Sequence, residues 1–110
     1  MARIELSFYD KKYVIEFDRE SVKEFFRQKD EILKESDDPI DNAEQLVAFI
    51  KCGLIKHHKN DMPSDDDIFG WVMAMGEDAM PFMEALRDMV NDVLTVVQTD
   101  RKNLKWGKVN

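Results

Sequence analysis

The first residues of the chain alternate between apolar and polar side chains, and this pattern most constrains what the chain can fold into. The apolar positions are Ile4, Leu6 and Phe8, followed after the polar YDKK by Tyr13, Ile15 and Phe17. A period of two puts alternate side chains on one face of a strand. Residues 3–17 therefore predict a β-hairpin. Because a two-stranded sheet is only marginally stable alone, its apolar face has to pack on other elements.

Beyond residue 18 the apolar spacing becomes that of amphipathic helices, and the first two are expected at 19–35 and 41–59. Asp18 and Ser21 are both N-cap candidates for the first, and Ser21 with Glu24 matches a capping box. The second follows Pro39, with Asp41 or Asn42 as its N-cap. A glycine within it, Gly53, costs about 1 kcal/mol relative to alanine unless a neighbouring backbone needs the space.

Two further helices are predicted at 65–75 and 79–99. Ser64 with Asp67 forms a capping box for the third helix, which ends at Gly76. Pro81 suits the first turn of the fourth. We therefore expect a single α+β domain over residues 1–100, mostly helical, with the hairpin packed on about four helices. Residues 101–110 show no period and predict a flexible basic tail.

The charge of the chain excludes several classes of partner. The net charge is -7, and residues 1–100 alone carry 12 bases against 23 acids, because four of the bases lie in the tail. Such an acidic body argues against nonspecific nucleic-acid binding and against anionic membranes. No apolar run approaches the roughly 18 residues of a membrane span, and the N-terminus lacks the apolar core of a signal peptide. The protein is expected in the cytoplasm.

The residues that could support catalysis or metal binding do not form a recognisable constellation. His57 and His58 are adjacent, so on a helix they point about 100° apart and cannot both face one metal. Cys52 is the only cysteine and lies among apolar residues, as a buried thiol would. Asp65 and Asp67 resemble the start of a calcium loop, but helix capping explains them better. We therefore expect no catalytic residue, no metal and no cofactor, and no enzymatic activity.

Five of the seven methionines lie between Ile68 and Met89. Four of them surround the expected helix junction, namely Met73, Met75, Met80 and Met83. Methionine is unbranched and polarisable, so it fills irregular gaps in cores and also recurs on surfaces that accept varied partners. Two interpretations stay open: ordinary core packing, or a groove for an apolar segment of another protein.

The tail offers a second candidate for binding, Trp106, a large aromatic residue between Lys105 and Lys108. Three interpretations are open for it. The tail is a disordered end, or Trp106 anchors it on another chain, or Trp106 folds back onto the acidic body of its own molecule.

The order of these features resembles the tail assembly chaperones of long-tailed phages and of prophages in Gram-positive bacteria. The resemblance lies in the opening IELSFYDKKYVIEFDRESVKEFF (Ile4–Phe26), in the acidic helices after it, and in the tail with its lysines and tryptophan. It covers most of the chain and contains no catalytic motif. It implies a protein of the host cytoplasm that coats the hydrophobic tape measure protein and keeps it soluble while tail tube subunits polymerise around it. Such chaperones are not found in the mature virion.

The resemblance also implies that a longer, frameshifted form recruits the tail tube protein, and that the chaperone forms homo-oligomers. Lys-Asn at 102–103 and Gly107-Lys108 are dipeptides whose codons can form slippery runs. Two alternatives remain. One is a head–tail connector or another phage morphogenesis protein that stays in the virion. The other is a small regulatory module, such as an inhibitor or antitoxin, that binds one folded partner.

Overall fold

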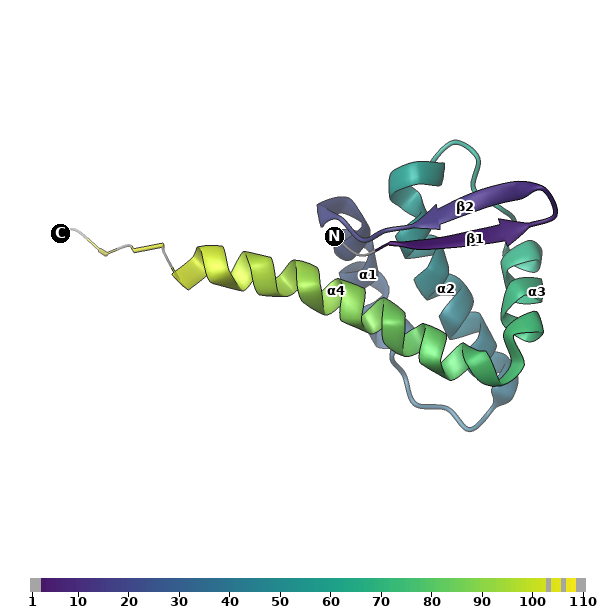
Figure 1. The fold of residues 1–110 in the computed structure, drawn as a ribbon. Coiled ribbons are helices and arrows are strands. Elements are labelled where there is room, and N and C mark those ends of the chain that lie inside the picture. Colours follow the sequence, from purple (N-terminus) through teal and green to yellow (C-terminus); the bar gives the residue numbers. More distant parts are fainter. Residues whose placement is uncertain (1–2, 103, 106, 109–110) are drawn as a thin grey trace.

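The protein is an α+β fold in which an N-terminal hairpin is followed by helices, as the alternating and helical periods predict (Figure 1). The structure is a computed structural model. It describes the backbone of residues 3–102, 104–105 and 107–108, and the side chains of 3–95, 104–105 and 107–108. In that part of the chain the elements are β1 (Ile4–Phe8), β2 (Lys11–Ile15), α1 (Arg19–Ile32), α2 (Pro39–His58), α3 (Asp65–Met75), the 3-10 turn η1 (Gly76–Asp78) and α4 (Ala79–Lys102).

The hairpin strands β1 and β2 are antiparallel, with Phe8 opposite Lys11. Two residues therefore form the turn, and the first of them, Tyr9, has a φ of +54°. A positive φ at this position matches the right-handed twist of the strands. The strands end at Ile15, two residues before the predicted boundary, because the next amide, that of Glu16, donates to a carbonyl of α2 and leaves the ladder.

The hairpin lies across α2, and their contact is close at Gly53 (Figure 1). The Glu16 amide donates to the Gly53 carbonyl at 2.9 Å. A Cβ on Gly53 would stand 2.5 Å from Cγ2 of Ile15 and 3.0 Å from the ring of Phe17. The neighbouring backbone thus needs the space that a side chain at position 53 would occupy, which accounts for a glycine in the middle of a long helix.

Helix α1 begins at Arg19, as predicted, and of the two N-cap candidates the structure selects the first. Its N-cap is Asp18, whose carboxylate accepts from the amide of Ser21 at 2.9 Å. The proposed capping box of Ser21 and Glu24 is wrong, because the Ser21 hydroxyl is buried and donates to the Glu16 carbonyl. The helix also stops at Ile32, three residues before the predicted end. It packs on α2 mainly through Phe25, whose ring stacks on that of Phe49.

The starts of α2 and α3 follow their capping residues. Helix α2 begins at Pro39, two residues earlier than predicted, because proline suits the first helical position and Asp38 caps it. Helix α3 has the predicted bounds, and the Ser64 hydroxyl accepts from the Asp67 amide at 3.1 Å. Asp65 and Asp67 therefore lie in the first turn of a helix, and the geometry of a calcium loop is excluded.

Helix α4 is the longest element and extends well beyond the rest of the molecule (Figure 1). Its N-terminal half packs on the body through the buried side chains of Leu86, Met89 and Val90. The helix continues to Lys102, three residues beyond its predicted end, so the first two residues of the basic tail are helical. No helix in the described part of the chain is both long enough and apolar enough to cross a membrane.

Candidate functional site

An open, largely apolar groove of about 790 Å³ lies at the end of the body where α3 meets α4. We call it the methionine groove. The α3–α4 side contributes Met73, Gly76, Ala79, Met80 and Met83, and the opposite side contributes Ile32, Leu33, Pro39, Ala43 and Leu46 from α1, α2 and the loop between them. It has the size of a typical ligand pocket and is lined mainly by apolar side chains.

The structure divides the methionines between core and surface. Met89 is buried, whereas 54% of Met73 and 71% of Met80 remain exposed. Met83 is half-buried and lines the groove with these two. Met75 is also half-buried but does not line the groove, so it does not join the other three predicted binding residues. Part of the methionine-rich stretch therefore packs in the core, and part lines an exposed groove.

The α3–α4 side of the groove depends on Gly76. Its φ of +55° lies in the left-handed region that favours glycine, and a side chain added there would meet open space. This conformation ends α3 and redirects the chain into η1 and α4. Met73 and Met80, on either side of that turn, consequently face the same groove.

The opposite side is the α1–α2 loop, residues 33–38, and side-chain amides hold it in place. Gln45 donates to the Lys34 carbonyl at 2.6 Å, and Asn42 donates to the Ser36 carbonyl at 3.1 Å. The Ser36 hydroxyl in turn donates to Asp41. These bonds order the loop before any partner arrives, which lowers the entropy cost of binding.

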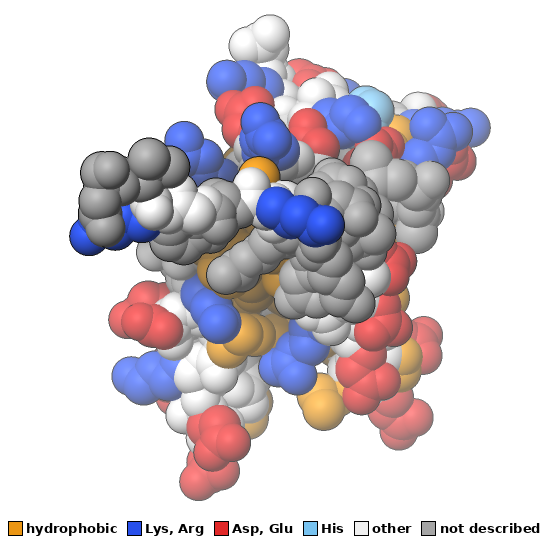
Figure 2. Space-filling model, turned by 90° about the vertical axis from the view of Figure 1, so that its left-hand side faces the viewer, with side chains coloured by type: hydrophobic (Ala, Val, Ile, Leu, Met, Phe, Trp, Pro, Cys, Tyr) orange, Lys and Arg blue, Asp and Glu red, His pale blue; other side chains and the backbone are white. Residues whose placement is uncertain are grey.

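The rim of the groove carries both charges: Glu35, Asp37 and Glu84 are acidic, and Lys34 and Arg87 are basic. Residues 35–44, here called the acidic segment, contain five exposed carboxylates and no base: Glu35, Asp37, Asp38, Asp41 and Glu44. None of the five forms an ion pair within the described residues, whereas acids elsewhere do, for example Asp61 with Lys11 and Asp65 with Lys51. In Figure 2 acidic side chains are prominent in the lower half of the molecule, toward the α1–α2 loop. Two of these carboxylates accept hydrogen bonds within the fold, Asp38 from the Ile40 amide and Asp41 from the Ser36 hydroxyl.

Trp106, the fifth predicted binding residue, lies outside the described residues. Sequence patterns also missed one half of the groove. Leu33, Pro39, Asn42 and Gln45 line that half, and nothing in the local sequence indicated that they would face the α3–α4 junction. The available signal was the pair of amides on the first turns of α2, which are suited to bond a neighbouring loop.

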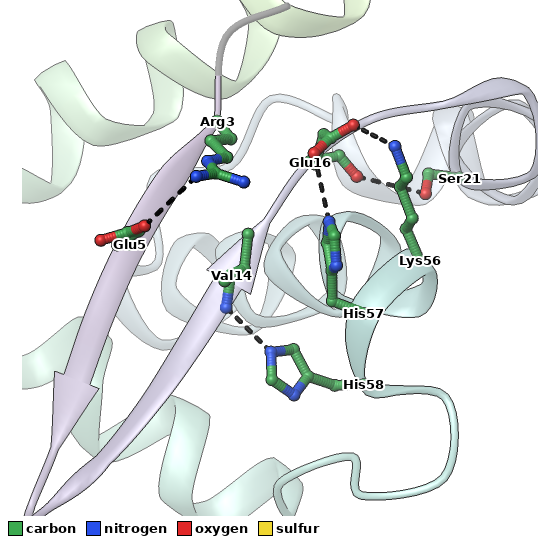
Figure 3. A network of polar contacts seen from close by, with 8 residues as sticks. All are labelled: Arg3, Glu5, Val14, Glu16, Ser21, Lys56, His57 and His58. Atoms are coloured by element: carbon green, nitrogen blue, oxygen red, sulfur yellow. Dashed lines mark hydrogen bonds and ion pairs between the residues drawn. The ribbon is translucent and has the colours of Figure 1, made fainter.

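A second polar cluster joins the hairpin to the end of α2 (Figure 3). The Glu16 carboxylate is bound by the Lys56 ammonium and by the His57 ring, the latter at 3.1 Å. The pKa of Glu16 lies below its usual value. The hydrogen bond from Lys56 is the largest cause, and the hydrogen bond from His57 is the second. Only 11% of the Glu16 side chain is exposed, so removing either cation leaves a carboxylate that solvent hardly reaches.

His58 is buried next to this cluster and has both ring nitrogens engaged (Figure 3). Nε2 accepts from the Val14 amide at 2.8 Å, and Nδ1 faces Asp61 at 3.2 Å. An amide can donate only to an unprotonated nitrogen, so His58 is neutral with its proton on Nδ1. The same Asp61 binds Lys11, which together with His58 lowers its pKa. His57 thus binds Glu16, whereas His58 binds Val14 and Asp61. Together the two histidines connect the hairpin to α2.

The other chemistry-bearing groups are engaged in the fold. Cys52 is buried, and burial raises the pKa of its thiol to about 12, which makes it a poor nucleophile. Among the described residues no group of three His, Cys, Asp or Glu side chains could hold a metal ion. We therefore take the methionine groove as the candidate binding surface.

Comparisons with known proteins add no assignment. No family model, no curated protein and no solved structure matches this chain.

Proposed function

We propose that this chain is a protein-binding module that receives an apolar segment of a partner protein in the methionine groove, and that it acts as a phage tail assembly chaperone. The exposure of Met73 and Met80 on an open groove carries the proposal. Large exposed apolar patches on soluble proteins usually mark interaction sites. Methionine side chains adapt to varied apolar partners at low energetic cost.

The charge and the shape of the groove fit a chaperone role. The chain has a net charge of -7, so complexes of the chain with an insoluble client repel one another and stay in solution. The ordered α1–α2 loop provides one fixed side, and the flexible thioether chains of α3 and α4 provide the other. A groove of this kind binds apolar side chains without selecting one particular sequence. A client with many similar apolar segments requires such a binding site.

The proposed client is the tape measure protein, a long hydrophobic protein, which the chain keeps soluble in the host cytoplasm before tail assembly is complete. The tail tube protein is the proposed second partner of a longer frameshifted form. This assignment rests on the resemblance of Ile4–Phe26 and of the overall layout to such chaperones. The proposal involves no catalysis.

The test is co-expression of this chain with the long protein encoded beside its gene, followed by affinity capture and measurement of the soluble fraction. We expect the long protein to become soluble and to be captured with the chain. The variant Met73→Glu with Met80→Glu should abolish both effects, because an apolar client would have to bury two carboxylates and strip them of their water. Both residues are exposed, so the variant should fold normally, as far-ultraviolet circular dichroism will verify.

The control is Tyr9→Glu, which places one carboxylate on a large, exposed residue at the hairpin tip, outside the groove lining (Figure 1). It should bind the client as the unmodified chain does. Equal binding by the Met73/Met80 variant would refute the groove. A chain found in purified virions would instead identify a structural morphogenesis protein. A tight complex with one folded partner, without rescue of the long protein, would identify a regulator.

A further inference from the structure

We propose that oxidation of Met73 and Met80 to the sulfoxide closes the methionine groove to apolar ligands, and that reduction of the sulfoxides reopens it. The inference rests on the proposed function in one respect, because the partner that is lost on oxidation is the client. The oxidation and the change in the groove need no client, and both are tested without one.

The sulfur atoms of the groove lie on one of its two sides. Met73, Met80 and Met83 line the α3–α4 side, and among the described residues the opposite side contains no sulfur. That opposite side presents isoleucine, leucine, proline and alanine side chains, which oxidants of methionine leave unchanged. Oxidation therefore changes the polarity of one side of the groove and leaves the α1–α2 side as it is.

The exposure of the methionines separates groove from core. Met73 is 54% exposed and Met80 is 71% exposed, whereas Met89 is only 6% exposed. An oxidant in solution reaches an exposed thioether directly, but it reaches a buried one only when the core opens. The groove methionines should therefore react long before Met89, and the fold should survive the change.

The cysteine does not compete for the oxidant. Cys52 is the only cysteine in the chain, it is buried, and burial raises the pKa of its thiol to about 12. The thiolate is the form that reacts with oxidants, and almost none is present at neutral pH. Mild oxidation of the native chain therefore acts on exposed methionine first.

The reaction is a two-electron transfer of oxygen. Hydrogen peroxide gives one oxygen atom to the thioether sulfur, its O–O bond breaks, the sulfur is oxidised, and water leaves. A reductase reverses the step: two thiols become a disulfide, and the oxygen leaves as water. The sulfoxide is polar, so an apolar ligand that covers it removes its water and binds about tenfold or more weakly for each sulfoxide buried.

Peptide mass spectrometry after brief treatment with hydrogen peroxide measures which methionines react. In the native chain, Met73 and Met80 should gain oxygen at least about five times faster than Met89, and in concentrated urea the rates should become similar. The oxidised chain should keep its helical circular dichroism. Equal rates in the native chain would overturn the inference, because the core would then oxidise together with the groove.

Fluorescence of anilinonaphthalene sulfonate, a dye that binds apolar surfaces, measures the groove without a client. Oxidation should weaken dye binding about tenfold or more, and the two methionine sulfoxide reductases, one for each epimer, should restore it. The leucine variant, Met73→Leu with Met80→Leu, should bind the dye equally well before and after peroxide. Unchanged binding by the oxidised chain would overturn the inference, as would no binding by the reduced chain or a loss of binding by the treated leucine variant.

Two further variants separate the groove from the other methionines. Met75 is half-buried and does not line the groove, so Met75→Leu should lose dye binding on oxidation as the unmodified chain does. Met73→Gln with Met80→Gln carries polar side chains of similar length and should bind the dye weakly without any oxidant. Protection by Met75→Leu, or full binding by the glutamine variant, would contradict the assignment to Met73 and Met80.

The client experiment distinguishes this inference from the proposed function. The long protein encoded beside the gene is synthesised in a reconstituted cell-free system that contains no reductase, together with the reduced chain, the oxidised chain or the oxidised leucine variant. The reduced chain and the oxidised leucine variant should keep it soluble, and the oxidised chain should not. Failure of the reduced chain would refute the proposed function and leave the dye result standing. Success of the oxidised chain would overturn this inference alone.

Discussion

Gly53 and Ile15 are packed so closely that no side chain fits between α2 and the hairpin. A Cβ at position 53 would stand 2.5 Å from Cγ2 of Ile15. Gly53→Ala gains about 1 kcal/mol of helix propensity but forces the strand away from the helix, a type of overpacking that costs about 1–3 kcal/mol. Because the Glu16 amide also bonds the Gly53 carbonyl, we expect a net loss of stability in urea unfolding followed by circular dichroism.

Gly70 provides the matched control for this substitution. It is an exposed residue of α3, and a Cβ there meets nothing within 4 Å. Gly70→Ala should raise the free energy of unfolding by about 1 kcal/mol, because only the helix propensity changes. A Gly53→Ala variant as stable as Gly70→Ala would contradict the close packing of β2 on α2.

Glu16 is predicted to make stability depend on acid pH. Its folded-state pKa is lowered by the hydrogen bonds from Lys56 and His57, so its contribution is present above the ordinary pKa near 4.5 and is lost as the pH falls through the folded value. Glu16→Gln should therefore be less stable than the unmodified chain at pH 7, and the difference should shrink below about pH 4. Urea unfolding at a series of pH values measures it.

Glu20→Gln is the control for the acid dependence, because Glu20 pairs with Lys59 at 3.3 Å on the open surface. Exposed ion pairs contribute little, so this variant should follow the unmodified chain within about 0.5 kcal/mol at every pH. If Glu16→Gln behaved in the same way, the buried ion cluster would not stabilise the fold.

Truncation of Met89 should lower the free energy of unfolding far more than truncation of Met80. Met89 is buried in the core, so Met89→Ala should cost about 2–5 kcal/mol of unfolding free energy. Met80 is 71% exposed, and Met80→Ala should change stability by less than about 0.5 kcal/mol. Thermal and urea unfolding of both variants checks this. A large loss at Met80 would mean that its side chain is part of the core and is not free for binding.

Cys52 should be inert in the native protein. Burial raises the pKa of its thiol to about 12, and the side chain is inaccessible to reagents. A disulfide reagent at pH 8 should react with it only at the rate of unfolding, and at once in concentrated urea. The variant Tyr9→Cys with Cys52→Ala, whose thiol lies at an exposed position, should react immediately. Rapid labelling of native Cys52 would show that α2 opens readily.

Local sequence patterns predicted much of the fold. Alternation over Ile4–Phe8 and the stripe on α3 predicted their elements closely, because strand and helix periods are properties of neighbouring residues. The ends of α1 and α2 were predicted less accurately. Asp18 and Ser21 are both good caps, and the burial of Ser21 against the Glu16 carbonyl, a tertiary contact, decided between them.

The sequence by itself determined the fold class, the acidic body with its basic end, and a methionine-rich helix junction. Tertiary structure alone decided which methionines are core and which are surface, because that depends on what lies opposite each side chain. The α1–α2 loop is held by Asn42 and Gln45. It lies opposite Met73 and Met80, and the two sides together form the groove. Likewise, Gly53 is necessary only because Ile15, 38 residues earlier in the chain, crosses α2 at that point.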